Sequence, residues 1–127
     1  MFNNSFLKKL NILFIESNTE DREHFSNILY KFFNNVVVCS NGKDGIDNFL
    51  EKRQEYFLDI IICDKTLEDI TGIEVLKKIR EIDSEIPFII TSPKIEVDDL
   101  LIAIKYKATD YLSKPINGKD MIFCIER

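Results

Sequence analysis

The segment IICDKTLEDITGIEVLKKIR, residues 61–80, places a single carboxylate, Asp64, at the end of an apolar run. The apolar residues before Asp64 are continuous enough for a strand buried on both faces of a sheet. From Gly72 onward, the apolar residues recur with the spacing of a helix. A buried carboxylate costs free energy unless it is paired or binds a metal. An acid at the carboxyl end of a parallel strand, however, lies where α/β sheets bind their ligands.

The rest of the chain alternates between the same two patterns. Strands are predicted at 11–16, 36–40, 58–64, 87–91 and 109–113, and helices at 19–33, 42–53, 72–82, 95–108 and from 118. In helix 95–108, the inward side chains are expected to be Val97, Leu100, Leu101 and Ile104. Five strand–helix units predict an α/β fold, a flavodoxin-like (βα)5 three-layer sandwich whose parallel sheet has the strand order 2-1-3-4-5. Residues 1–9 are expected to form an N-terminal arm, and residues 10–127 one domain.

Composition narrows the class of protein further. A chain of 127 residues suits one domain, and its net charge of -5 argues against direct binding to nucleic acid. No apolar segment approaches the length needed to span a membrane, so no membrane contact is expected. Cys39, Cys63 and Cys124 form no CxxC pair, which is typical of buried thiols in a reducing cytoplasm. His24 is the only histidine, so zinc binding and Ser–His or Cys–His catalysis are not expected.

Polar side chains stand at several predicted strand ends. In the order 2-1-3-4-5, the ends of the first, third and fourth strands meet in one crevice, and they carry Glu16, Asp64 and Ser92. The fifth strand brings Lys114 to the same edge. The glycine patterns of dinucleotide sites and P-loops are absent. The set suits an anionic group on Asp64, balanced by a divalent cation and by Lys114, with the Ser92 hydroxyl donating to it.

Four segments, in this order, resemble the receiver domain of bacterial two-component response regulators. They are ILFIES (12–17), IIICDKTLEDITGIEVLKKIR (60–80), PFIITS (87–92) and ATDYLSKP (108–115). The spacings also match that family, with 28 residues from Asp64 to Ser92 and 22 from Ser92 to Lys114. The resemblance extends from about Leu10 to the end of the chain.

The resemblance implies a role for each matching residue. Asp64 is expected to accept a phosphoryl group from a histidine kinase or a phosphotransfer protein, and Ser92 and Lys114 to bind that group. Ser92 and Tyr111 are expected to change conformation on activation. The Lys114–Pro115 bond is expected to be cis, which proline permits at a small cost. The chain is not expected to be an enzyme beyond self-phosphorylation and self-dephosphorylation at Asp64.

The same resemblance implies a site for Mg²⁺ or Mn²⁺ formed by Glu16, Asp64 and the backbone carbonyl of Thr66. The family usually has a second acid after the first one, where this chain has Ser17. Serine supplies no charge, so weak metal binding is expected and Ser17 is a doubtful ligand. Glu68 stands where proline is usual, and it is either an extra acid for the site or a residue that points to solvent.

Two functions remain open on this basis. The first is a phosphorylation-dependent switch that changes the face formed by helix 95–108, strand 109–113 and the last helix. This face carries the apolar residues Ile102, Tyr106 and Phe123, and it is expected to contact an output domain or to form a homodimer. The alternative is an atypical receiver, a phosphorylation-independent interaction module, which Ser17, Glu68 and Pro93 favour. The last helix is shorter than usual for the family, so an output domain is expected in a longer protein.

Overall fold

The computed structural model describes residues 4–126 and has a parallel sheet of five strands in the order β2-β1-β3-β4-β5. The strands are β1 (Asn11–Ile15), β2 (Asn35–Cys39), β3 (Ile60–Asp64), β4 (Phe88–Ser92) and β5 (Asp110–Ser113). The helices are α1 (Asn4–Leu7), α2 (Thr19–Phe32), α3 (Gly42–Lys52), α4 (Gly72–Ile82), α5 (Val97–Lys105) and α6 (Gly118–Glu126). The predicted flavodoxin-like fold and strand order are therefore confirmed.

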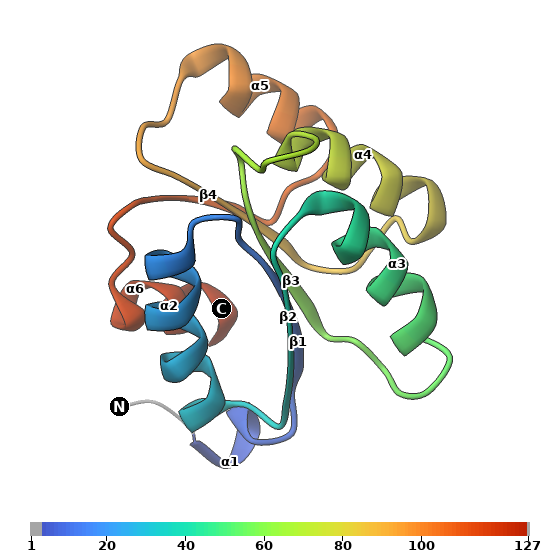
Figure 1. Cartoon of the computed structure of the whole chain (residues 1–127), viewed down its shortest axis with the longest axis vertical. Helices are drawn as coiled ribbons and strands as arrows, with labels where there is room; N and C mark the ends of the chain where they lie inside the picture. The colour runs from blue at the N-terminus through green and yellow to red at the C-terminus, as the bar shows by residue number, and fades with distance from the viewer. Residues whose placement is uncertain (1–3, 127) are drawn as a thin grey trace.

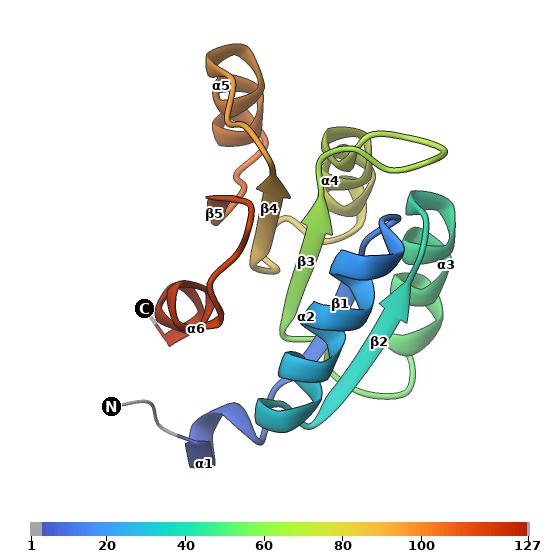
Figure 2. The same ribbon diagram turned by 60° about the vertical axis from the view of Figure 1, so that its left-hand side comes forward.

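The helices cover the sheet on both faces, which gives three layers (Figures 1 and 2). Helices α3, α4 and α5 lie over one face, where Phe49, Leu76 and Ile79 belong to the buried cluster. Helices α1, α2 and α6 lie on the other face, where Leu7 and Leu29 are fully buried. No helix within residues 4–126 combines the length and apolar character needed to cross a membrane.

Strand register brings the polar residues to one edge of the sheet. Asp64 pairs with Thr91 across β3 and β4, and Ser92 pairs with Ser113 across β4 and β5. Strands β1, β3 and β4 are buried along their whole length, as expected for a sheet covered on both faces. Because all strands are parallel, their carboxyl ends and the residues that follow them share this edge.

Helix α5 is packed differently from the prediction. Val97, Leu101 and Ile104, expected to face inward, are 71%, 58% and 62% exposed. Ala103 is buried and Leu100 is half-buried, so the inward side of α5 is centred on these two residues. The prediction was wrong because α5 is apolar around most of its circumference, and a periodicity argument cannot then select a face.

The apolar residues predicted on the outer face of α5, β5 and α6 differ in their exposure. Ile102 is 38% exposed, whereas Tyr106 is half-buried and packs against the core. The side chain of Phe123 lies outside the described residues.

Cys39 and Cys63 are free thiols. Cys39 and Cys63 are buried, and burial raises the pKa of Cys39 to about 11 and raises that of Cys63 well above its usual value. Cys124 is half-buried, and its thiol donates a hydrogen bond to the Asp110 carboxylate, 2.9 Å away. Thiols with raised pKa values are poor nucleophiles, so packing is the role of Cys39 and Cys63.

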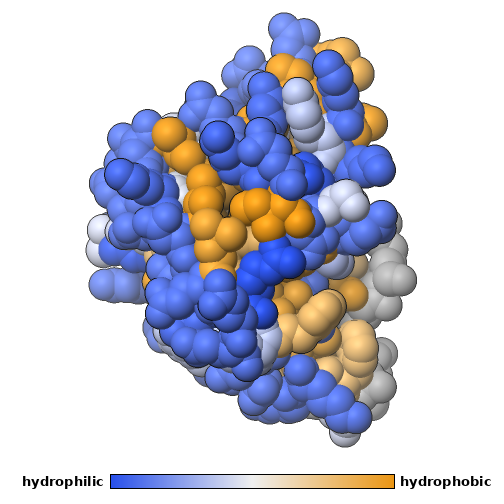
Figure 3. Space-filling view, turned by 90° about the vertical axis from the view of Figure 1, so that its right-hand side faces the viewer, coloured by the Kyte–Doolittle hydropathy of each residue, from blue (hydrophilic) through white to orange (hydrophobic). Residues whose placement is uncertain are grey.

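Helices α3 and α4 border an apolar groove on the surface. Figure 3 shows this side of the molecule, where apolar side chains form a strip among charged ones. The groove has a volume of about 310 Å³, and its lining residues are Ile46, Ile70, Glu74, Lys77, Lys78 and Glu81. None of these is a predicted site residue, although Ile70 belongs to the loop that follows Asp64.

Candidate functional site

Three acids surround one lysine at the carboxyl edge of the sheet. The Lys114 Nζ lies 2.6 Å from Glu16 Oε1, 3.1 Å from Asp21 Oδ2 and 3.2 Å from Asp64 Oδ1. We call these four residues the acid–lysine cluster. The side chains of Glu16 and Asp64 are only 2% and 6% exposed, so these ion pairs are shielded from water. Glu16, Asp64 and Lys114 thus meet as the sequence predicts, and the Lys114–Pro115 bond is cis.

The electrostatics of the acid–lysine cluster reflect this burial. Burial raises the pKa of Glu16 to about 6, although the hydrogen bond from Lys114 works in the opposite direction. Burial alone would lower the pKa of Lys114, but the hydrogen bond to Glu16 and the charge of Asp64 outweigh it and the pKa is raised. Asp64 Oδ1 is buried and has no hydrogen-bond partner among the described residues. Among the described residues, the ion pair with Lys114 is thus the polar contact that Asp64 Oδ1 makes.

Two residues of α2 belong to this region, and sequence reasoning did not find them. The carboxylate of Asp21, in the first turn of α2, contacts Lys114. The Arg22 guanidinium donates to the backbone carbonyls of Glu16 and Ser17, both at 3.1 Å. The signal was the short distance in sequence, because α2 begins three residues after Glu16 and its first turn lies next to the site.

Ser17 connects three segments of the backbone. Its hydroxyl donates to the Ser40 carbonyl at 2.6 Å and accepts a hydrogen bond from the Glu68 backbone N–H at 3.0 Å. Ser40 follows β2, and Glu68 lies in the loop between β3 and α4. The side chain of Glu68 is exposed and makes no hydrogen bond or ion pair within the described residues. Glu68 therefore contributes its backbone N–H here, and its exposed carboxylate makes no contact with the cluster within the described residues.

The loop that follows Asp64, residues 65–71, is fixed along its length, and we call it the acceptor loop. Thr66 pairs with Thr71 in an isolated antiparallel bridge. The Asp69 carboxylate accepts hydrogen bonds from the backbone N–H groups of Gly42 and Lys43 at 2.8 and 2.9 Å. The acceptor loop is thereby attached to the amino terminus of α3, where a negative charge is favourable.

The end of the acceptor loop depends on a glycine. The Gly72 N–H donates to the Lys65 carbonyl at 2.7 Å. A Cβ at position 72 would overlap the carbonyl oxygen of Asp64 and lie 2.9 Å from the Cα of Lys65. Thr71 caps α4 and forms a capping box with Glu74. Thr71 thus has a structural role at the start of α4.

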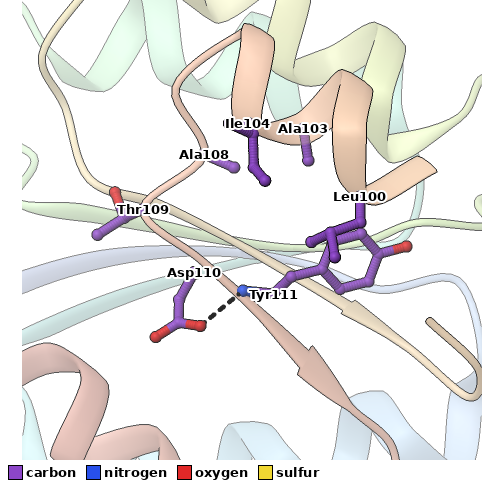
Figure 4. Close-up of a pocket in the computed structure, with 7 residues that line it drawn as sticks. All are labelled: Leu100, Ala103, Ile104, Ala108, Thr109, Asp110 and Tyr111. Atoms are coloured by element: carbon purple, nitrogen blue, oxygen red, sulfur yellow. Dashed lines mark hydrogen bonds between the residues drawn. The ribbon is translucent and has the colours of Figure 1, made fainter. Parts of the chain in front are cut away.

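Ser92 and Tyr111 are both buried, but neither hydroxyl bonds to Asp64 in this conformation. The Ser92 hydroxyl donates to the Lys94 carbonyl at 2.8 Å. The Tyr111 hydroxyl is buried without a hydrogen-bond partner among the described residues, and burial raises its pKa. Figure 4 shows the Tyr111 ring beside Leu100 of α5. The two predicted switch residues are therefore near the site and close to α5.

Comparisons with known proteins agree with this arrangement. A family profile described as "Response regulator receiver domain" matches residues 12–126. The transcriptional regulatory protein ZraR of Klebsiella oxytoca is 35% identical over 82 residues, which are 65% of this chain and 18% of that protein. The response regulator ArlR of Staphylococcus aureus is 34% identical over 88 residues, which are 69% of this chain and 38% of that protein. The chain thus spans well under half the length of these curated relatives.

Solved structures share the fold. A response regulator receiver domain protein from Clostridium thermocellum superimposes with a TM-score of 0.84 at 24% identity, covering 92% of this chain and 91% of that one. The N-terminal domain of an uncharacterized protein from Wolinella succinogenes gives 0.83 at 27% identity, with the same coverage. Together with the profile match over residues 12–126, these observations show that the chain belongs to the response regulator receiver domain family.

Proposed function

We propose that this chain is a phosphorylation-dependent signalling switch in which Asp64 accepts a phosphoryl group from a phosphohistidine of a histidine kinase or phosphotransfer protein. The main support is the position of the Asp64 carboxylate, which is buried and whose Oδ1 lies 3.2 Å from the Lys114 ammonium with no hydrogen bond to it among the described residues. A carboxylate oxygen attacks the phosphorus, so an O–P bond forms and the P–N bond breaks. The electron pair of the P–N bond stays on the imidazole nitrogen of the donor. Attack by water later releases the phosphoryl group and restores the carboxylate.

Lys114 supplies charge for this step. Phosphorylation adds about -1.5 to -2 charge at neutral pH. The Lys114 ammonium already contacts Asp64 and Glu16, and its raised pKa keeps it protonated. It therefore lies where an added phosphoryl oxygen requires a counter-charge.

A divalent cation, Mg²⁺ or Mn²⁺, fits the donor set, and weak binding is proposed. The hard donors are the buried carboxylates of Glu16 and Asp64, together with the backbone carbonyl of Thr66. No group of three or more acidic, histidine or cysteine side chains within the described residues is arranged to hold a metal ion. The cation would neutralise phosphoryl oxygens during transfer. Ser17 adds no charge, and its hydroxyl already makes two hydrogen bonds.

The conformational response is proposed to begin at Ser92. For its hydroxyl to donate to a phosphoryl group, it must leave the Lys94 carbonyl, which it contacts at 2.8 Å. That change would move the β4–α5 connection and open space beside the buried Tyr111 ring. Ser92 and Tyr111 are in this proposal the switch residues between Asp64 and α5.

The responding surface is proposed to be the face of α5, β5 and α6. Val97, Leu101 and Ile104 follow one another at helical spacing on α5 and are mostly exposed. A mostly apolar exposed stripe is typical of an interaction surface. An output domain in a longer protein, or a second copy of this chain as a homodimer, is the proposed partner.

One observation favours the alternative, a receiver that works without phosphorylation. The Ser17 and Ser92 hydroxyls are both engaged with backbone groups, and Lys114 is already paired with the acids around it. In that case the fold presents a fixed surface, and the site serves stability.

The two functions are distinguished by treating the protein with acetyl phosphate and Mg²⁺ and measuring its intact mass. Phosphorylation predicts one added phosphoryl group that is absent in Asp64→Asn and present in the control Asp47→Asn, because Asp47 is an exposed acid of α3. Peptide mapping should locate the group on Asp64. An unmodified parent protein, or a modification that survives in Asp64→Asn, would refute the switch and support the alternative.

A further inference from the structure

Helix α5 is fastened by polar contacts at its carboxyl end. The Arg80 side chain of α4 donates from Nε to the Tyr106 carbonyl at 3.1 Å and from Nη2 to the Lys107 carbonyl at 2.8 Å. Its Nη1 donates to the Asp83 carbonyl at 3.2 Å. The Tyr106 and Lys107 carbonyls follow the last turn of α5, where a positive charge is favourable. Arg80 therefore holds the end of α5 against the end of α4.

The middle of α5 is only loosely packed. A cavity of about 220 Å³ lies between Leu100, Ala103 and Ile104 of α5 and the β5 segment with Tyr111 (Figure 4). Ala103 is the one described residue of α5 that is fully buried. A helix with so few buried side chains gains little from packing, so contacts at its two ends decide where it lies.

The amino-terminal turn of α5 is held by an ion pair. The Lys65 Nζ lies 2.7 Å from Asp99 Oδ2, and the two side chains are 20% and 30% exposed. The hydrogen bond to Asp99 raises the pKa of Lys65, so the ammonium is charged. Lys65 is the residue directly after Asp64, which makes this pair a connection between the predicted phosphorylation site and α5.

The backbone of Lys65 is fixed, but its side chain can exchange partners. The Lys65 N–H donates to the Thr91 carbonyl, and its own carbonyl accepts from Gly72, both at 2.7 Å. The lysine side chain is flexible, so the ammonium can move although the backbone is held in place. Asp99 also contributes to the electrostatic environment of the Tyr111 hydroxyl, and so does Lys65. Both charges of the pair thus act on the buried aromatic that is expected to switch.

We propose that the Lys65–Asp99 ion pair is a latch that holds the amino-terminal turn of α5 in its resting position. A phosphoryl group on Asp64 adds about -1.5 to -2 charge on the residue next to Lys65, and this charge competes electrostatically with Asp99 for the Lys65 ammonium. When the latch opens, α5 turns about its attachment to Arg80 and closes or enlarges the cavity beneath it. The competition by a phosphoryl group rests on the proposed function of Asp64, whereas the resting latch does not.

The resting latch is tested by hydrogen–deuterium exchange of the α5 amides in the untreated protein. Lys65→Met and Asp99→Asn should each increase exchange by about threefold to fivefold, the range of a partly buried ion pair. The double variant should exceed neither single variant, because both remove one interaction. The matched control is Asp98→Asn, which removes the same charge from the same turn although Asp98 makes no ion pair within the described residues. Equal effects of Asp98→Asn and Asp99→Asn, or additive effects of the two single variants, would overturn the latch.

The competition is tested with beryllofluoride as the phosphoryl probe. In the parent protein it should raise α5 exchange to the level of Lys65→Met, and in Lys65→Met it should add nothing further. An equal increase in both proteins would overturn the competition. Failure of the proposed function has a different signature, because beryllofluoride would then leave the amides of Asp64 and Thr66 unchanged. The exchange rates of the untreated variants would still decide whether the resting latch exists.

Discussion

Replacing Ser17 by an acid tests whether the missing carboxylate limits metal binding. Ser17→Asp would place a third carboxylate beside Glu16 and Asp64. At about 4 Å and an effective dielectric of 20, one such charge attracts a divalent ion by several kcal/mol before hydration is counted. Loss of hydration and repulsion among the acids remove most of that gain. We therefore expect Mg²⁺ to bind about tenfold more tightly, a change of roughly 1.4 kcal/mol.

The structure adds a stability effect in the opposite direction. The Ser17 hydroxyl donates to the Ser40 carbonyl at 2.6 Å, and an ionised aspartate cannot donate. The Ser40 carbonyl would lose its partner and face a carboxylate, at a cost of about 1–3 kcal/mol. The bond from the Glu68 N–H can persist, since a carboxylate also accepts. The metal-free variant should therefore unfold more easily than the parent, and Mg²⁺ should recover part of the loss.

Calorimetric Mg²⁺ titration and denaturant unfolding at one ionic strength decide the matter. The control is Ser17→Ala, which removes both hydrogen bonds without adding charge. It should lose about 1–2 kcal/mol of stability and bind Mg²⁺ more weakly than the parent, because the hydroxyl no longer holds the acceptor loop. Equal affinities of Ser17→Asp and the parent would refute the charge argument. A weaker affinity in Ser17→Ala would show that the hydroxyl is a ligand or that it positions one.

Three further predictions concern the supports of the site. Asp69→Ala should lower the free energy of unfolding by about 1 kcal/mol, because it removes the acceptor for the first N–H groups of α3. Burial would raise the pKa of Asp69, but its backbone hydrogen bonds outweigh this effect and lower the pKa. The contribution of Asp69 to the free energy of unfolding is therefore complete above the unfolded pKa of 3.8 and is lost as the pH falls through the folded pKa. Unfolding of both proteins at neutral pH and at about pH 2 checks this, and a difference that persists in acid would contradict it. Lys107→Gly should raise the free energy of unfolding by about 0.5–1 kcal/mol, because Lys107 has a φ of 63°; a thermal unfolding midpoint that does not rise would contradict this. Leu100→Ala should cost about 1–2 kcal/mol and Leu101→Ala under about 0.5 kcal/mol, and equal losses in denaturant unfolding would show that the inward side of α5 is assigned wrongly.

The fold was predictable because each strand and most helices carry an unambiguous pattern. β3 is apolar throughout and ends in Asp64, and α4 begins at Gly72 with a clear stripe that includes Leu76 and Ile79. Parallel connections then leave few strand orders to consider. The meeting of Glu16, Asp64 and Lys114 followed from the strand order alone, since all three stand at or just beyond strand ends.

The parts that could not be predicted depend on short-range geometry. Asp21 and Arg22 reach the site through the path of the β1–α2 connection, which the sequence does not specify. The double role of the Ser17 hydroxyl depends on the exact approach of Ser40 and Glu68, which are distant in sequence. Such contacts vary with displacements of about 1 Å, whereas patterns of hydrophobicity report only which face is buried.

The replacement of an acid by Ser17 has a consequence beyond the loss of charge. A carboxylate at position 17 would repel Glu16 and Asp64 and could not donate to Ser40, so a bound cation would be needed to offset this repulsion. With serine, the hydroxyl oxygen holds the Glu68 N–H at 3.0 Å without any ion. The carboxylate of the next residue, Asp69, attaches the loop to the start of α3. The loop that carries the Thr66 carbonyl is thus organised before a cation arrives, and less conformational freedom remains to be lost on binding. The serine therefore weakens attraction for the metal and strengthens the preorganisation of the site, and comparison of Ser17→Ala with Ser17→Asp separates these two effects.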